Sequence, residues 1–332
     1  MPKKPVKRKR KISKRYPIHQ CLLYKTGSIN KLAEKLGFDK HDFEKILENP
    51  QYKKFIISEE LNPFSLKKTK ARTVQEPIND LRKIHERILY LLEPIELPDY
   101  AHAAVKKRSY RSNATAHISS SAMATFDLKN FYGSTQSQLV YFFFLDGLQC
   151  SSDVAGALTK LTTFCNAMPT GSPLSPLLSL HAAKEMLDRI YNLAGSLDLI
   201  FTCYIDDLTL SGKKIPKSLE RHICRIINLY GYKLSANKTR IFGDGSVKHV
   251  TGVVIHNGTL KVPYSRFRTS RNLESAICGT FPTHGHSNLK LHEKLAGLLG
   301  ETAYLDSSYS VRAAKAQEKL KAVRLEESVK QN

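Results

Sequence analysis

Apolar residues recur every three or four positions in several stretches of the chain, a spacing that predicts amphipathic helices. Residues 28–49 predict two short helices, with Ser28 as the N-cap of the first. Residues 72–93 predict one long helix with Leu81, Ile84 and Ile88 on a single face. Further helices are expected over residues 134–144 with Ser134 as cap, from the turn at 168–176 to about Leu193, over 217–231, and through the basic tail from 265.

Alternating and β-branched runs predict strands between these helices. Residues 121–128 form one such run, and 199–212 form two runs joined at Asp206 and Asp207. Residues 250–262 predict a hairpin, because Asn257-Gly258 favours a type I′ turn. The stretches 60–71 and 102–117 are polar and predict a link and an irregular segment. The order of elements predicts an α+β fold in which helices back an antiparallel sheet.

The net charge of the chain indicates the class of its binding partner. The 332 residues carry a formal net charge of +22, and such an excess favours a polyanionic partner, nucleic acid ahead of anionic lipid. No apolar run approaches the roughly 20 residues of a membrane span, so no membrane partner is expected. Residues 1–27 begin with a basic run and predict an N-terminal arm. The six cysteines contain no C-x-x-C pair, which favours a reducing cytoplasm over a disulfide framework.

The adjacent carboxylates of Asp206 and Asp207 stand between two apolar runs. Ordinary turn chemistry explains them in part, since Asp is common in turns. A divalent cation explains them better if a third carboxylate joins them, because carboxylates forced together repel and Mg²⁺ binds oxygen ligands. Asp127 ends a predicted strand. If that strand lies beside the hairpin, the three side chains suit two ions and attack of a hydroxyl on an α-phosphate.

Four motifs in order resemble those of reverse transcriptases. Residues 204–207 (YIDD) resemble the Y-x-D-D motif, and 126–134 (FDLKNFYGS) resemble the first metal-binding motif. Residues 168–179 (MPTGSPLSPLLS) are similar to the L-P-Q-G-x-x-x-S-P segment, and 231–239 (GYKLSANKT) resemble a later lysine-containing element. Thr170 stands where the family usually has Gln, which puts nucleotide handling in doubt but not the metal chemistry.

Two shorter strings are similar to signatures of bacterial retron reverse transcriptases. Residues 113–117 (NATAH) match N-A-x-x-H, and 250–252 match V-T-G. The resemblance implies a right-hand polymerase: fingers, a palm with an antiparallel ferredoxin-like sheet backed by helices, and a small helical thumb. The expected boundaries are the basic arm at 1–27, the N-terminal region and fingers at 28–122, the palm at 123–264 with a fingers segment around 146–170, and the thumb at 265–332.

The same resemblance implies an RNA-directed DNA polymerase of the bacterial cytoplasm. Its template would be a cognate structured non-coding RNA (msr–msd), and its substrates would be dNTPs. Synthesis would start from a guanosine 2′-hydroxyl and give branched RNA–DNA (msDNA), in anti-phage defence with an effector protein. Related alternatives are reverse transcriptases of group II intron, diversity-generating or abortive-infection type. A different alternative is a non-catalytic RNA-binding protein that keeps the polymerase fold.

The resemblance also assigns roles at the chemical site. Asp127, Asp206 and Asp207 would hold two Mg²⁺ ions, for which Mn²⁺ is a possible substitute, and Leu128 would add its backbone carbonyl. Lys238 would protonate the leaving pyrophosphate; a surface lysine on phosphate is the plainer interpretation.

Further residues are expected around the substrates. The expected nucleotide-binding residues are Lys107, Arg108, Arg111, Tyr132, Thr170 and Gly171. The expected RNA-binding residues are Asn113, His117, Val250, Thr251 and Gly252. Plainer roles remain open for several: core packing for Tyr132, a solvated basic face for Lys107, Arg108 and Arg111, a structural role for His117 and a bulge at Gly252.

Overall fold

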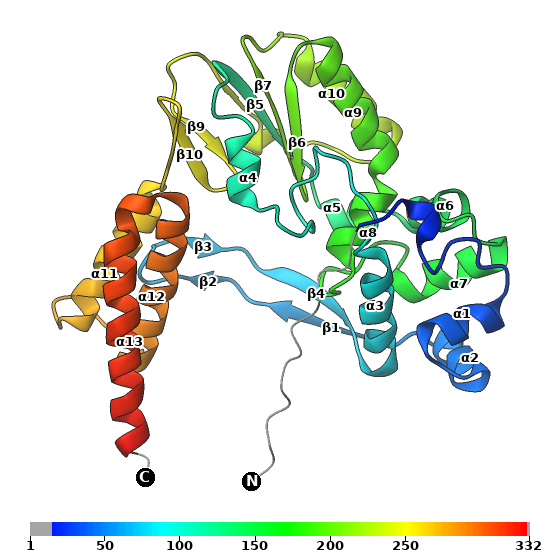
Figure 1. Cartoon of the computed structure of the whole chain (residues 1–332), viewed down its shortest axis with the longest axis horizontal. Coiled ribbons are helices and arrows are strands. Elements are labelled where there is room, and N and C mark those ends of the chain that lie inside the picture. The colour runs from blue at the N-terminus through cyan, green and yellow to red at the C-terminus, as the bar shows by residue number, and fades with distance from the viewer. Residues whose placement is uncertain (1–14, 331–332) are drawn as a thin grey trace. The chain divides into compact units, whose positions relative to one another are not determined.

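The computed structural model describes residues 15–330 (Figure 1), and its chain divides into two compact units. The first unit comprises Met1–Lys53, Gln75–Pro98 and Tyr132–Lys184, and the second comprises Lys54–Val74, Asp99–Phe131 and Glu185–Asn332. The units are interleaved along the chain, whereas the expected domains are consecutive segments. The two units do not correspond one to one with the arm, fingers, palm and thumb, so the expected domain boundaries stay a prediction.

The first unit is built from helices around one apolar core. Its helices are η1 (Ile18–Gln20), α1 (Ile29–Leu36), α2 (Lys40–Glu48), α3 (Asn79–Leu92), α6 (Ser137–Phe142), the π-helix η2 (Phe143–Gly147), α7 (Ser152–Thr162) and α8 (Ser175–Ala182). Leu32, Ile84, Ile88 and Leu158 are fully buried in the core. The two predicted short helices are thus confirmed, and Ser28 caps α1 by accepting a hydrogen bond from the Lys31 amide.

The N-terminal segment differs from the expected arm. Residues 1–14 lie outside the described part of the chain. After them the chain already packs: the Tyr16 amide donates to the Pro94 carbonyl, and Cys21 and Leu23 belong to the core of the first unit. Residues 16–27 therefore pack on the first unit, where Tyr16 and Cys21 also donate hydrogen bonds to the Leu91 carbonyl of α3.

Three predicted helices were wrong in extent. Arg72–Pro77 forms strand β4, which pairs with β1 (Tyr52–Ile57), and helix α3 begins only at Asn79. The helix expected from Ser134 is divided, because α5 (Phe131–Ser134) ends at that residue and α6 begins after Gln136. The helix expected to reach Leu193 is interrupted at Ala183, between α8 and α9 (Lys184–Ser196).

The second unit contains the sheets. β5 (Ala122–Asp127), β6 (Ile200–Tyr204), β7 (Asp207–Gly212) and β8 (Arg240–Phe242) form an antiparallel sheet in the order β6-β7-β5-β8. A second sheet has the order β11-β10-β9, from β9 (Lys248–Val250), β10 (Val253–His256) and β11 (Thr259–Lys261). The mixture of helices and antiparallel sheets agrees with the expected α+β class.

Helices complete the second unit. They are α4 (Tyr110–Thr115), α9, α10 (Leu219–Leu229), η3 (Ala236–Lys238), α11 (Tyr264–Ile277), α12 (Asn288–Leu305), η4 (Ser307–Tyr309) and α13 (Ser310–Lys330). Figure 1 shows α11, α12 and α13 side by side, and Leu273, Leu295 and Leu320 pack in their common core. The helical tail predicted from 265 is confirmed. None of the described helices is long and apolar enough to cross a bilayer.

Two polar segments contain structure that the pattern did not predict. The link at 60–71 includes a short hairpin of β2 (Glu60–Leu61) and β3 (Lys68–Thr69). The irregular stretch at 102–117 includes α4, which Ser109 caps through a capping box with Ser112. Both were missed because their few residues carry no apolar period.

Candidate active site

The three predicted aspartates lie at one end of the four-stranded sheet. Asp127 ends β5 and is the direct register partner of Asp207, the first residue of β7. Asp206 lies in the turn between β6 and β7, and its carbonyl accepts a 2.9 Å hydrogen bond from the Leu128 amide. Antiparallel pairing thus brings Asp127 close to two carboxylates that are 79 and 80 positions later in the sequence.

The turn that carries Asp206 is tight and strained. Tyr204 pairs with Asp207, so only Ile205 and Asp206 connect the two strands. Ile205 has φ of 59°, a left-handed value that is rare for a β-branched residue and costs about 1–3 kcal/mol. The strand pairs on both sides hold this geometry, which places two acidic residues in succession at the end of the sheet.

Burial and mutual repulsion disfavour the ionised carboxylates. Burial, followed by the charges of Asp206 and Asp127, raises the pKa of Asp207 to about 6. Burial, and then the charge of Asp127, also raises the pKa of Asp206. Since a cation between such groups favours their charged form, the electrostatics of this end of the sheet suit a positively charged partner.

Lys238 supplies one such charge. Its Nζ donates a 2.6 Å hydrogen bond to Oδ2 of Asp127, and this bond is the first cause of a raised pKa for Lys238. The segment before it is fastened to the end of β5, because the Ser235 amide donates to the Asp127 carbonyl and the Lys129 amide donates to the Lys233 carbonyl. The Lys238 side chain remains 64% exposed.

The carboxylates suit a divalent cation by chemistry, although the side chains do not yet form its ligand sphere. Within residues 15–330, no three His, Cys, Asp or Glu side chains are arranged so that they could hold a metal ion. Asp127 instead bonds Lys238. Carboxylate oxygens are nevertheless the ligands that hard cations prefer, and Asp127, Asp206 and Asp207 repel one another without one. The metal contact expected of Leu128, which is buried, stays a prediction.

The predicted nucleotide loop, residues 168–175, belongs to the first unit and is fixed from within it. Thr170 is exposed, and its Oγ1 donates a 2.9 Å hydrogen bond to Oε1 of Gln75 on β4. The Gly171 amide donates to the Gln75 carbonyl. The position where the family usually has Gln therefore receives the amide side chain of Gln75, a contact that the sequence did not reveal.

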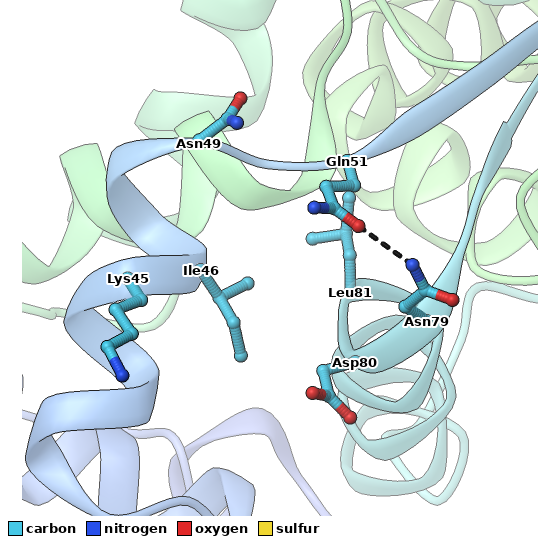
Figure 2. A pocket seen from close by; sticks show the side chains of 7 residues that line it. All are labelled: Lys45, Ile46, Asn49, Gln51, Asn79, Asp80 and Leu81. Atoms are coloured by element: carbon cyan, nitrogen blue, oxygen red, sulfur yellow. Dashed lines mark hydrogen bonds between the residues drawn. The ribbon is translucent and has the colours of Figure 1, made fainter.

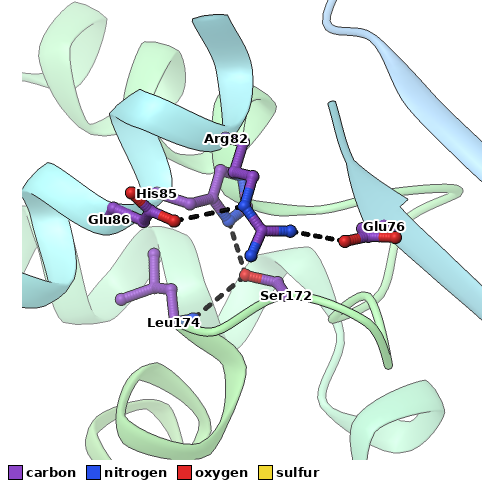
Figure 3. Close-up of polar contacts among 6 residues, drawn as sticks. All are labelled: Glu76, Arg82, His85, Glu86, Ser172 and Leu174. Atoms are coloured by element: carbon purple, nitrogen blue, oxygen red, sulfur yellow. Dashed lines mark hydrogen bonds and ion pairs between the residues drawn. The ribbon is translucent and has the colours of Figure 1, made fainter. Parts of the chain in front are cut away.

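A buried histidine on α3 supports the same loop (Figure 3). Nδ1 of His85 is hydrogen-bonded to Ser172 Oγ at 2.6 Å, and the Leu174 amide donates to that oxygen. Nε2 of His85 donates to the Leu161 carbonyl at 2.8 Å. Figure 3 also shows Arg82 bound to Glu76 and Glu86 beside this network. The only sequence signal for this support was the position of His85, a polar residue on the apolar face of a predicted helix.

The first unit also contains a small polar pocket (Figure 2). Its volume is about 180 Å³, and Asn79 donates a 2.8 Å hydrogen bond to Gln51 at its wall. Pockets that enclose a drug-sized ligand measure roughly 300–1,000 Å³. The pocket is therefore too small for a nucleoside triphosphate.

The two aromatic residues after Asp127 differ in their surroundings. Phe131 stacks on Tyr232 with ring centroids 5.6 Å apart, as expected of a core residue. Tyr132 is half-buried and packs against the core of the first unit. Its expected place under the nucleotide sugar stays a prediction.

The expected triphosphate-binding residues lie on and before α4. Arg108 donates to the Ala101 carbonyl at 2.7 Å and forms an ion pair with Asp99 at 2.8 Å, so its guanidinium holds its own loop. Lys107 is exposed, and the exposed Arg111 lies over the Tyr304 ring at 5.0 Å. Triphosphate binding by Lys107, Arg108 and Arg111 stays a prediction.

Direct RNA contact does not fit Asn113 and His117, because both side chains are fully buried. His117 is hydrogen-bonded to Ser211 at 2.6 Å and to Thr202 at 2.7 Å, and Asn113 Nδ2 donates to Thr251 Oγ1 at 3.3 Å. Val250 ends β9 and is buried, whereas the turn to β10 is formed by Thr251, which is half-buried, and Gly252, which is exposed.

The buried histidines should make the fold sensitive to acid. Burial lowers the pKa of His85 to about 4, and burial together with the charge of His102 lowers that of His117 to about 3. Below the unfolded-state pKa of about 6.5, these histidines are protonated in the unfolded chain but stay neutral in the folded chain. Stability is thus present at neutral pH and falls on acidification by up to about 1.4 kcal/mol per pH unit for each histidine.

Urea unfolding at about pH 7.5 and about pH 5 measures this effect. Each histidine is expected to contribute about 2 kcal/mol of the loss. His85→Gln should reduce the loss, whereas His256→Gln, at an exposed position, should leave it unchanged. Equal acid sensitivity in wild type and His85→Gln would contradict the assignment.

Comparison with known proteins shows which proteins this chain is similar to. A family model described as reverse transcriptase (RNA-dependent DNA polymerase) matches residues 65–255. The retron Ec86 reverse transcriptase of Escherichia coli is 29% identical over 214 residues, which cover 63% of this chain and 67% of the relative. The retron Se72 reverse transcriptase of Salmonella heidelberg (strain 579083-10) is 27% identical over 293 residues, which cover 84% of this chain and 76% of the relative.

Proposed function

Since this chain belongs to the reverse transcriptase family, as an RNA-directed DNA polymerase of the retron type, we propose that it copies part of its own structured non-coding RNA into DNA. The observation that carries this proposal is the pairing of Asp127 with Asp207, next to Asp206, at one end of the sheet. A protein that only bound RNA would not need three carboxylates whose charges repel one another and repel the ligand.

Asp127, Asp206 and Asp207 would hold two Mg²⁺ ions, with Mn²⁺ as a substitute. When bound, such ions activate the attacking hydroxyl and neutralise charge on the triphosphate. The β5–β7 ladder keeps Asp127 and Asp207 opposed. Lys238 would give a proton to the leaving pyrophosphate, since it is a cationic donor already located at this cluster.

The loop at Thr170 and Gly171 would contact the incoming dNTP. Gln75 accepts hydrogen bonds from the Thr170 side chain and the Gly171 amide, and His85 is hydrogen-bonded to Ser172, the next residue of the loop. A rigid loop positions a substrate without an ordering cost at each cycle. Tyr132, Lys107 and Arg111 are further candidates for contact with the sugar and the triphosphate.

Membership of the retron type supports a more specific proposal about the template, the primer and the product. The template and primer would be one cognate RNA (msr–msd), and synthesis would start from a guanosine 2′-hydroxyl to give branched RNA–DNA (msDNA). The complex would act in anti-phage defence with an effector protein. Similarity to the retron reverse transcriptases supports these statements.

Nucleic acid that co-purifies with the protein tests the product. We expect one short DNA that remains joined to RNA after denaturation and is released by an enzyme that cleaves 2′–5′ branches. Sequencing should map the DNA and RNA to adjacent parts of one transcript. The matched control is the Asp206→Asn, Asp207→Asn double variant, which should retain the RNA but carry no attached DNA. Unbranched DNA, or DNA from many templates, would contradict the retron type.

A further inference from the structure

Helix α4 contacts two sheets of the second unit, although it is only six residues long. It contacts β6 in the sheet that carries the aspartates, and β9 and β10 in the three-stranded sheet. Its capping box fixes its start, and Asn113 and Ala114 form its buried face. A short helix whose buried face contacts two sheets is suited to fix their separation.

The first attachment of α4 is His117, directly after the helix. Its two ring nitrogens are hydrogen-bonded to Thr202 on β6 and Ser211 on β7. These are the two strands whose connecting turn contains Asp206. Ser120 Oγ adds a 2.8 Å hydrogen bond to Ser211. The position of α4 is thus tied to the strand pair that presents the acidic residues.

The second attachment of α4 is the turn between β9 and β10. Val250 pairs with Val253, so Thr251 and Gly252 form a two-residue turn. Asn113 Nδ2 donates to Thr251 Oγ1 at 3.3 Å, and that hydroxyl donates to the Tyr110 carbonyl at 3.4 Å. Both hydrogen bonds join the turn to α4 through one side-chain oxygen.

Thr251 is an unfavourable residue for this turn. Its φ is 44° and that of Gly252 is 76°. Asn or Gly is preferred where both turn residues have positive φ, and a β-branched residue is an outlier there. The other turn of the sheet has the favoured pair, Asn257 and Gly258. Thr251 therefore costs backbone strain, but it supplies a hydroxyl that is hydrogen-bonded to Asn113 and Tyr110.

We propose that α4 is a brace that holds the Thr251–Gly252 turn at a fixed position relative to the Asp206–Asp207 turn, with Asn113 and His117 as its positioning residues. Neither residue touches substrate, since both are buried. The proposal rests on the proposed function, because the brace matters only if the turn meets the primed template while the aspartates perform the chemistry. The two short sequence strings at 113–117 and 250–252 then belong to the same brace, because their side chains contact each other.

Kinetics of primed-template extension test the brace. Thr251→Gly relieves the backbone strain but also removes the hydroxyl that Asn113 and Tyr110 bind, and these two changes act in opposite directions on the free energy of unfolding. The KM of this variant for primed template should rise about three- to tenfold, the equivalent of one or two lost hydrogen bonds, with an unchanged KM for dNTP. Asn113→Ala should give a similar rise. The double variant should be no worse than either single variant, because both changes break one coupling.

Asn257→Gly is the matched control, because it changes the other two-residue turn at the opposite end of β10 and should leave every constant unchanged. Thermal unfolding of each variant separates lost positioning from lost fold. An unchanged template KM in Thr251→Gly, or additive effects in the double variant, would overturn the brace. Wild-type protein that fails to incorporate dNTP would instead overturn the proposed function, so the two failures are distinguishable.

Discussion

Replacing Asp206 and Asp207 together with Asn is expected to reduce dNTP incorporation on a primed RNA template by at least about 10³-fold. Metal-ion stabilisation of transition-state charge contributes several kcal/mol, and each 1.36 kcal/mol corresponds to tenfold in rate. An amide keeps the size of the carboxylate but carries no charge. The melting temperature should stay the same or rise, because the change removes repulsion among buried carboxylates.

Asp198→Asn is the matched control for this experiment. Asp198 is exposed and has φ of 53°, a backbone conformation that Asn adopts readily. It precedes β6, so it reports on the same part of the fold without entering the acidic cluster. Incorporation at the wild-type rate by the double variant would remove these two residues from the chemistry.

Replacing Lys238 with Met should give the second largest loss, about 100-fold in the rate of the chemical step, which is the lower range for general acid catalysis. The change keeps the alkyl chain and removes both the proton donor and the cation that bonds Asp127. Single-turnover incorporation measures the chemical step apart from product release. Lys233→Met is the control, since Lys233 is exposed in the same segment.

Lys238→Arg separates the two roles of this residue. Arginine keeps the positive charge but does not release its proton in proteins. If Lys238 is the acid that protonates pyrophosphate, Arg should be nearly as slow as Met. Recovery of the wild-type rate with Arg would show that only the charge matters, and would refute proton transfer from this side chain.

Elements with a strong local signal could be predicted from the sequence. Strand β5, the β6–β7 hairpin and the Asn257-Gly258 turn are confirmed. Helix α10 is also confirmed, and Gly231 follows it with φ of 79° as a left-handed terminator. In these cases the hydrophobic period and the turn chemistry agree, so the local sequence alone determines the element.

The hydrophobic pattern gave wrong predictions where contacts with residues distant in the sequence determine the structure. β4 was interpreted as the start of a helix because its residues alternate weakly, and its pairing with β1 is what makes it a strand. The roles of His85 and His117 could not be read locally either, since their hydrogen-bond partners lie 33–94 positions away. The aspartates were predicted because Asp127, Asp206 and Asp207 fall in motifs that resemble those of reverse transcriptases, whereas the groups that support them are single polar residues on apolar faces.

The interleaving of the two units affects how the chain can fold during synthesis. The first unit needs segments as distant as Met1–Lys53 and Tyr132–Lys184, so it cannot close before Lys184 has left the ribosome. At about 5–20 residues per second, the nascent apolar faces of α1 and α3 wait for roughly ten seconds for their partners in α7 and α8. The chain should therefore depend on chaperones while it is made, and no single cut should divide the gene into two fragments that fold separately.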